Sequence, residues 1–351
     1  MAHKLESGVD RMVSTRRDTI WHRDETEADG RLLIIAPSDP ESTVLEGAAY
    51  VWPDGADNDV VGTKPLVTAD GTPIASHVAT VSRTGRVLGV VGKDYNPIAF
   101  KYLMSEWILA LARAGGNLET LGTFNGGRNF FGCMEVADAW RVPGDHSDTR
   151  GLLNVTGSHD GTGGLRASFQ SFRVVCSNTD AMFADAHDAI TDATEKARRA
   201  WVTVRHSANA EERIKDAVQW IIDGRARVES ERQLMARLAA KSLSKQEVDA
   251  FVNQYINVPD DASNRVRSIR GNDRDAFVAT LRDVQDLGNH ALTGAGISAY
   301  GLLQAVTRFE DHVSRVNNVA DVPVGTRRAF RAFLGERQTE KSAARDLIMS
   351  L

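Results

Sequence analysis

The stretch from Glu119 to Thr179 constrains the fold most, because its apolar residues recur with a period of two rather than 3.6. Asn125-Gly126 and Asp160-Gly161 interrupt the apolar runs, and such pairs are typical of tight turns between antiparallel strands. After Arg128 the alternating positions are apolar on both faces, which indicates a central strand that is covered on each side. The sequence therefore predicts an antiparallel sheet in the middle of the chain.

Helical patterns lie on both sides of this sheet. Ala75–Val81 and Val87–Val91 predict a hairpin, and Asn96-Pro97 predicts the start of a helix that ends at Gly115-Gly116. From about residue 207 onward, apolar residues recur at helical spacing. The predicted fold class is α+β, with an antiparallel sheet, one crossing helix and a mostly helical C-terminal region.

Three segments follow from this pattern: an acidic, partly ordered arm (1–62), a core of sheet and helix (63–206), and a helical region packed on that core (207–351). Residues 1–62 contain 13 Asp/Glu and 6 Lys/Arg, whereas the rest of the chain is nearly neutral. We expect the arm to be a solvated tail, or else a cover for a basic groove of the same chain. Because bulk positive charge is missing, a nucleic-acid groove would have to be local.

The composition is that of an ordinary globular protein, with 42% hydrophobic and 25% charged residues. No apolar run approaches the roughly 18 residues that span a bilayer, and the first residues lack an apolar signal segment. We therefore expect a cytoplasmic protein without a membrane partner. Cys133 and Cys176 fall within predicted strands, which favours buried reduced thiols over a disulfide or a metal pair.

Arg173 is the most informative charged residue, because it interrupts an apolar strand and its guanidinium needs a partner or an open groove. If the strands are neighbours, Arg173 could join Arg128 and Arg166 in a stripe across one face of the sheet. Such a stripe would follow a phosphate backbone. The alternative is a buried ion pair of Arg173 with Glu119 or Glu135.

Four further residues extend this hypothetical binding surface. Lys93 and Lys101, at the edge of the predicted helix, would add positive charge. Tyr95 and Phe124 could stack on bases, as aromatic side chains do in proteins that bind single strands. The stripe and these four residues together predict a site for single-stranded nucleic acid.

A metal site is the alternative chemistry. His159-Asp160 is similar to the His-Asp pair of metal-dependent phosphohydrolases, and His206 or Asp311-His312 could complete a cluster. However, the pair lies in a glycine-rich turn, where Asp accepts backbone hydrogen bonds and Gly supplies positive φ. The sequence favours this turn interpretation.

No cofactor is predicted. Asn125–Arg128 and Gly161–Gly164 are rich in glycine and could approach phosphates, but neither is followed by the Lys-Ser/Thr of a nucleotide-binding loop. No Ser-His-Asp order, Cys-His pair or isolated carboxylate dyad stands out either. A non-enzymatic role therefore fits the sequence better than a catalytic one.

Six short motifs occur in order along the second part of the chain: Leu88–Tyr95, Gly127-Arg128, Ser158–Gly161, Arg173–Thr179, Arg205-His206 and Ala305–His312. By these motifs, residues 64–351 resemble phage- and plasmid-like proteins that form a family of unknown function. The resemblance implies an origin in a phage, prophage or plasmid, with the host cytoplasm as the location, and supplies no activity. The usual family form lacks the acidic Arg23–Asp59 arm.

The predicted architecture is also similar to that of single-strand annealing recombinases of the RecT/Erf type, which phages carry. That similarity implies a homo-oligomer that holds one DNA strand between sheet and helices. The leading hypothesis is therefore a cofactor-free protein that binds or anneals single-stranded DNA in recombination. The alternatives are a metal-dependent nuclease or phosphohydrolase, and a phage regulatory or host-interaction protein.

Overall fold

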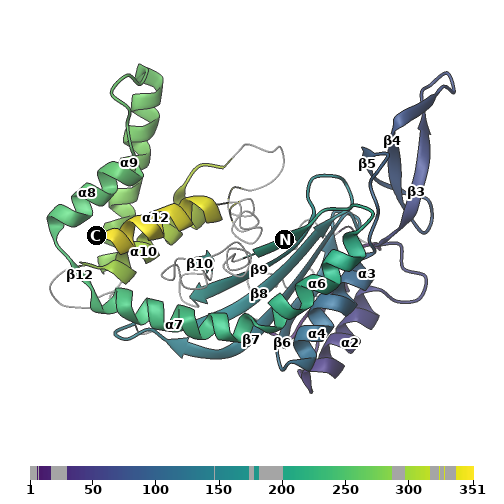
Figure 1. The fold of residues 1–351 in the computed structure, drawn as a ribbon, viewed down its shortest axis with the longest axis horizontal. Helices are drawn as coiled ribbons and strands as arrows, with labels where there is room; N and C mark the ends of the chain where they lie inside the picture. Colours follow the sequence, from purple (N-terminus) through teal and green to yellow (C-terminus); the bar gives the residue numbers. More distant parts are fainter. Residues whose placement is uncertain are drawn as a thin grey trace. The chain divides into compact units, whose positions relative to one another are not determined.

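Figure 1 shows the computed structural model as a ribbon coloured along the sequence. The chain forms two compact units that interleave along the sequence. Unit 1 contains Met1–Ala137, Leu152–Phe169 and Ile190–Ala226, and unit 2 contains Asp138–Gly151, Gln170–Ala189 and Arg227–Leu351. The division into contiguous segments at 62/63 and 206/207 stays a prediction. The structure describes residues 6, 8–16, 30–145, 147–173, 178–181, 201–286, 297–316, 324, 328 and 337–351.

The main sheet has the strand order β10-β9-β8-β7-β6-β1-β2, and β11 also pairs with β9. The pairs β6–β7, β1–β6, β9–β10 and β9–β11 are antiparallel, whereas β1 and β2 run parallel. This confirms the predicted α+β fold with an antiparallel sheet. The strands are β1 (Met12–Ser14), β2 (Leu32–Ile34), β6 (Asn117–Phe124), β7 (Asn129–Arg141), β8 (Asp148–Ser158), β9 (Leu165–Arg173), β10 (Asn178–Ala181) and β11 (Trp201–Val204).

The turn between β6 and β7 forms as the sequence predicts. Asn125, Gly126 and Gly127 all have positive φ, of 55°, 67° and 74°. The Asp10 carboxylate accepts hydrogen bonds from the backbone N–H groups of Gly126 (2.6 Å) and Gly127 (2.7 Å). Glycine tolerates this left-handed conformation without a steric penalty, so the Asn-Gly-Gly sequence fixes the turn.

Helices pack on the sheet within unit 1. The predicted crossing helix consists of α3 (Phe100–Leu103), the π-helical turn η2 (Met104–Ile108) and α4 (Leu109–Arg113). Helix α2 (Pro40–Val51) packs on β6 and α4, and α6 (Ala210–Ile222) packs on η2. The Trp107 indole donates a hydrogen bond to the Ile214 carbonyl (2.8 Å).

Part of the predicted acidic arm belongs to this core. Val13 on β1 and Val44 on α2 are fully buried, and Asp39 caps α2 ahead of Pro40. The acidic residues of the segment dominate its composition, so the apolar positions between them gave only a weak signal. These positions are nevertheless sufficient to attach β1 and α2 to unit 1.

A smaller antiparallel sheet contains β3 (Val60–Val67), β4 (Pro73–Ser82) and β5 (Val87–Gly92). Strands β4 and β5 form the predicted hairpin, and β3 adds a third strand next to β4. Strand β3 starts directly after Asp59, so the end of the predicted arm leads into this sheet.

The described part of unit 2 is mostly helical, as predicted. Ser244 and Glu247 form the reciprocal capping box at the start of α8. None of the described helices is long and apolar enough to cross a membrane. The elements that follow α6 are α7 (Gly224–Ala240), β12 (Ser242–Leu243), α8 (Lys245–Tyr255), α9 (Asn264–Asp286), β13 (Ile297–Ser298), α10 (Ala299–Arg308), η3 (Phe309–Val313) and α12 (Gln338–Ser350).

Candidate functional site

A buried histidine, His159, connects the end of β8 to other segments of unit 1. Its backbone N–H donates to the Arg128 carbonyl (2.7 Å), and its carbonyl accepts from the Thr80 hydroxyl (2.7 Å). Its imidazole has no solvent exposure and stacks on the Phe100 ring at a centroid distance of 3.7 Å. His159 therefore joins the β6–β7 turn, β4 and the first turn of α3.

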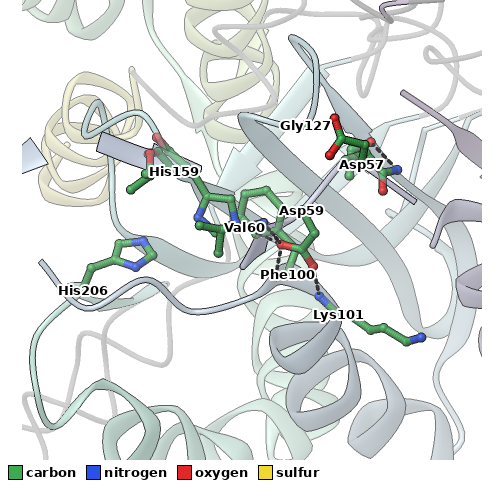
Figure 2. Close-up of polar contacts among 12 residues, drawn as sticks. Asp57, Asp59, Val60, Phe100, Lys101, Gly127, His159 and His206 are labelled. Atoms are coloured by element: carbon green, nitrogen blue, oxygen red, sulfur yellow. Dashed lines mark hydrogen bonds and ion pairs between the residues drawn. The ribbon is translucent and has the colours of Figure 1, made fainter. Parts of the chain in front are cut away.

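Asp59 holds the other side of this histidine. One carboxylate oxygen lies 3.1 Å from His159 Nε2 and accepts the Phe100 N–H (2.8 Å), and the other accepts the Lys101 N–H (3.0 Å) (Figure 2). Asp59 thereby satisfies two N–H groups at the start of α3, as a capping residue does. The helix begins at Phe100 and not at Asn96-Pro97 as predicted, because its cap is supplied from a distant part of the sequence.

His206 packs beside this pair. Its ring stacks on Tyr95 at 4.4 Å and lies 6.1 Å from the His159 ring, centroid to centroid, in an edge-on arrangement. His206 Nδ1 donates to the Asn96 carbonyl (3.2 Å), and the Tyr95 hydroxyl donates to the Ser158 carbonyl (3.0 Å). Burial and the proximity of His159 lower the pKa of His206 to about 4, whereas burial raises the pKa of Tyr95.

An open pocket of about 510 Å³ adjoins these rings. Its volume falls within the range of small-molecule sites. It combines a glycine-rich loop with aromatic, cationic and apolar side chains. The lining residues are His77, Val90, Val91, Gly92, Tyr95, Asp160, Gly161, Thr162, Gly163, Gly164, Arg205 and His206.

Asp160 organises the loop that borders the pocket. Its carboxylate accepts hydrogen bonds from the Ser158 hydroxyl and from the backbone N–H (2.9 Å) and hydroxyl (2.5 Å) of Thr162, and Gly161 has a φ of 82°. Burial opposes ionisation of Asp160, but these hydrogen bonds outweigh it and hold the pKa below the ordinary value. The turn interpretation of the Asp-Gly pair is confirmed.

The predicted cationic residues of unit 1 lie around this cluster. Arg128, Lys93 and Lys101 have exposed side chains, and so does Arg205, which the sequence analysis used only as part of a motif. Within the described residues none of the four forms an ion pair. Their backbones are adjacent to His159, to the pocket or to Asp59, so the cations belong to one region of unit 1.

The remaining predicted contacts are not assembled in this region. Phe124 is 1% exposed and packs against Phe131, so in the folded protein its ring is not accessible to a base, and the stacking role predicted for it is corrected. Arg166 is half-buried on β9 opposite Thr203, and burial lowers the pKa of its guanidinium. The side chain of Arg173 lies outside the described part, so the predicted arginine stripe and its alternative ion pair stay predictions.

The metal candidates are divided between the units. His159, Asp160 and His206 belong to unit 1, and His312, which lies on η3, belongs to unit 2. Among the described residues, no group of three or more His, Cys, Asp or Glu side chains could hold a metal ion. Cys133 is a buried thiol, as predicted, with its Sγ 3.8 Å from a Glu119 carboxylate oxygen, and Cys176 lies outside the described residues.

Comparison with known proteins identifies a family for this chain. The family model of a domain of unknown function, DUF932, covers residues 87–344. The chain belongs to the DUF932 family. No curated protein and no solved structure matches, so the phage or plasmid origin and the similarity to annealing recombinases stay predictions.

In this DUF932 protein, four of the six sequence motifs converge on the pocket and the histidine cluster. These are Leu88–Tyr95, Gly127-Arg128, Ser158–Gly161 and Arg205-His206. Asp59, which lies outside the matched range, was missed by the sequence analysis. Its position in an acidic stretch gave no local signal for its contact with a residue 100 positions away.

We expect Gly89→Ala to lower the free energy of unfolding by about 1–3 kcal/mol, the usual cost of overpacking. A Cβ atom at Gly89 would lie 2.3 Å from the Asp160 Cα, so β5 and the His159–Asp160 backbone would have to separate. Gly92→Ala is the matched control on the same strand, because a Cβ there meets nothing within 4 Å. Urea unfolding measures both, and an equal loss in the two variants would contradict the close approach.

Stability should rise between about pH 4 and pH 6.5, because His206 binds a proton more readily in the unfolded chain. The neutral imidazole is favoured in the folded state, so this contribution is lost as the pH falls through that window, by about 3 kcal/mol at most. His206→Gln should remove this part of the pH dependence, and His77→Gln, at an exposed site, should retain it. Urea unfolding of the wild type and both variants at pH 7 and pH 4.5, in the presence of a chelator, measures this difference in stability.

Proposed function

We propose that this protein binds single-stranded DNA on unit 1, at the surface formed by the pocket and the four exposed cations around it. The observation that carries the proposal is that Lys93, Lys101, Arg128 and Arg205 are all exposed and form no ion pair within the described residues. Cations that are not neutralised by carboxylates remain available to phosphates. They also attract a polyanion over a distance set by the salt concentration.

The charge is local, which favours a single strand over a duplex. The whole chain carries a net charge of −5, so bulk attraction to DNA is weak. The exposed cations lie on separate segments: the turn after β5, the start of α3, the β6–β7 turn and the residue after β11. A flexible single strand can follow such an irregular path.

The pocket supplies the second component of the site. Gly161 and Gly163 are exposed on its rim, where they leave the backbone open to close approach by a phosphate or a base. Tyr95 lines the same pocket, and His206 covers one of its faces, which fixes the orientation of the phenol ring. Of the two aromatic residues predicted to stack on bases, Tyr95 is the one that fits this role.

The proposed activity is binding and annealing of strands by a homo-oligomer in phage-type recombination, without a cofactor. Contacts to phosphates leave the base edges free to pair with a second strand. Annealing requires no covalent step, so the site needs only charge, a stacking surface and an open path.

The double variant Arg128→Ala/Arg205→Ala should weaken binding of a labelled oligothymidine strand roughly tenfold, because two phosphate contacts are lost. The wild-type chain should bind with sub-micromolar affinity at low salt, and the slope of log affinity against log salt should fall by about 1.4 in the double variant. Fluorescence anisotropy over a salt series measures both quantities.

The matched control is Arg113→Ala, which removes an exposed arginine of unit 1 that is already ion-paired with Glu41 at 2.8 Å. This control should bind like the wild type. Absence of binding by the wild-type chain at low salt, or an equal loss in control and double variant, would refute the proposal.

A further inference from the structure

Within the described part of the chain, the two buried histidines each have one ring nitrogen without a hydrogen-bond partner. These atoms are His159 Nδ1 and His206 Nε2. The His159 side chain has no exposure, and His206 is 8% exposed. A buried polar atom without a partner is costly, so two of them at neighbouring rings require an explanation.

The contacts of the other two ring nitrogens determine which nitrogens of the two histidines carry the hydrogens. His159 Nε2 faces the Asp59 carboxylate, and His206 Nδ1 faces the Asn96 carbonyl. Both of these groups are acceptors, so the histidine nitrogens that face them carry the hydrogens. In that tautomer, the other two ring nitrogens, His159 Nδ1 and His206 Nε2, carry no hydrogen and each present a lone pair.

The distance between the rings permits one shared ion at a wide N–metal–N angle, and a tetrahedral site would require the rings to move closer together. A metal–nitrogen bond of about 2.0–2.1 Å places the ring centre about 3.2 Å from the metal, so two ligating rings have centroids at most about 6.4 Å apart. The observed separation is 6.1 Å. Figure 2 shows the His206 ring on the side of His159 that faces away from Asp59.

We propose that His159 and His206 bind one transition-metal ion of the zinc class between His159 Nδ1 and His206 Nε2. Imidazole nitrogen is a preferred ligand for these metals. The hydrogen bonds to Asp59 and Asn96 match the outer contacts that orient metal-binding histidines and select their tautomer. A group of only two histidines can hold the ion if small molecules complete the coordination.

The pocket provides the route and the remaining ligands. His206 lines it, so an ion can enter from this side and complete its coordination with water or with an anionic ligand. A dication there would add positive charge close to Arg205, on the surface proposed for phosphates. The metal site itself does not depend on DNA binding.

Metal uptake by the tag-free chain of 351 residues, after chelation and dialysis, tests this site. Isothermal titration with Zn²⁺ should give one equivalent per chain, and Co²⁺ should give a visible absorption band from nitrogen coordination. His159→Gln and His206→Gln should each weaken uptake at least tenfold, whereas His77→Gln, which changes an exposed histidine of the same pocket, should retain one equivalent.

X-ray absorption of the zinc-loaded wild-type protein should show two imidazole ligands. This measurement tests the site even if a variant fails to fold. Absence of uptake by the folded wild-type chain would overturn the proposal, as would unchanged stoichiometry in both glutamine variants. A ¹⁵N NMR spectrum in the presence of Zn²⁺ could instead show a hydrogen bond between the two rings. That result would also overturn the proposal, because a proton would then occupy the place of the metal ion.

Discussion

The contact between Asp59 and His159 determines how the parts of unit 1 meet. One carboxylate binds the imidazole and the first N–H groups of α3, while the backbone of His159 binds the β6–β7 turn and β4. The pair is largely excluded from solvent, because the His159 side chain is 0% exposed and the Asp59 side chain 16% exposed. Removing the carboxylate would leave a buried ring nitrogen and a helix start unsatisfied together, so the effects at the two places are coupled.

This contact also explains why residues from distant motifs form one site. Tyr95 reaches the Ser158 carbonyl, His206 stacks on Tyr95, and the histidine cluster has the pocket beside it. The exposed cations that we assign to nucleic acid are held by the same backbone segments. The proposed affinity for nucleic acid and the integrity of the buried cluster would therefore both depend on this scaffold, although different side chains are responsible for each.

The features that sequence reasoning predicted are those set by near neighbours in the chain. Turn chemistry at Asn125-Gly126 and Asp160-Gly161 depends on positive φ and on short side-chain contacts, so the residues themselves specify it. The predicted cap at Asn96 failed because the actual cap, Asp59, arrives through tertiary structure. The predicted role of Phe124 failed for a related reason: alternation marks a side chain as facing one side of a strand, but not whether another layer covers that side.

Helix α12 illustrates how charge can specify a docking position. Two buried cations lie one turn apart on this helix. Lys341 binds Asp311 on η3 at 2.6 Å, and Arg345 binds Glu231 on α7 at 3.0 Å. A helix with a purely aliphatic face could shift or rotate by one residue and still pack against apolar side chains. Here any such shift would leave four buried charged groups without partners, which is strongly unfavourable. The two ion pairs therefore specify a single docking position for α12.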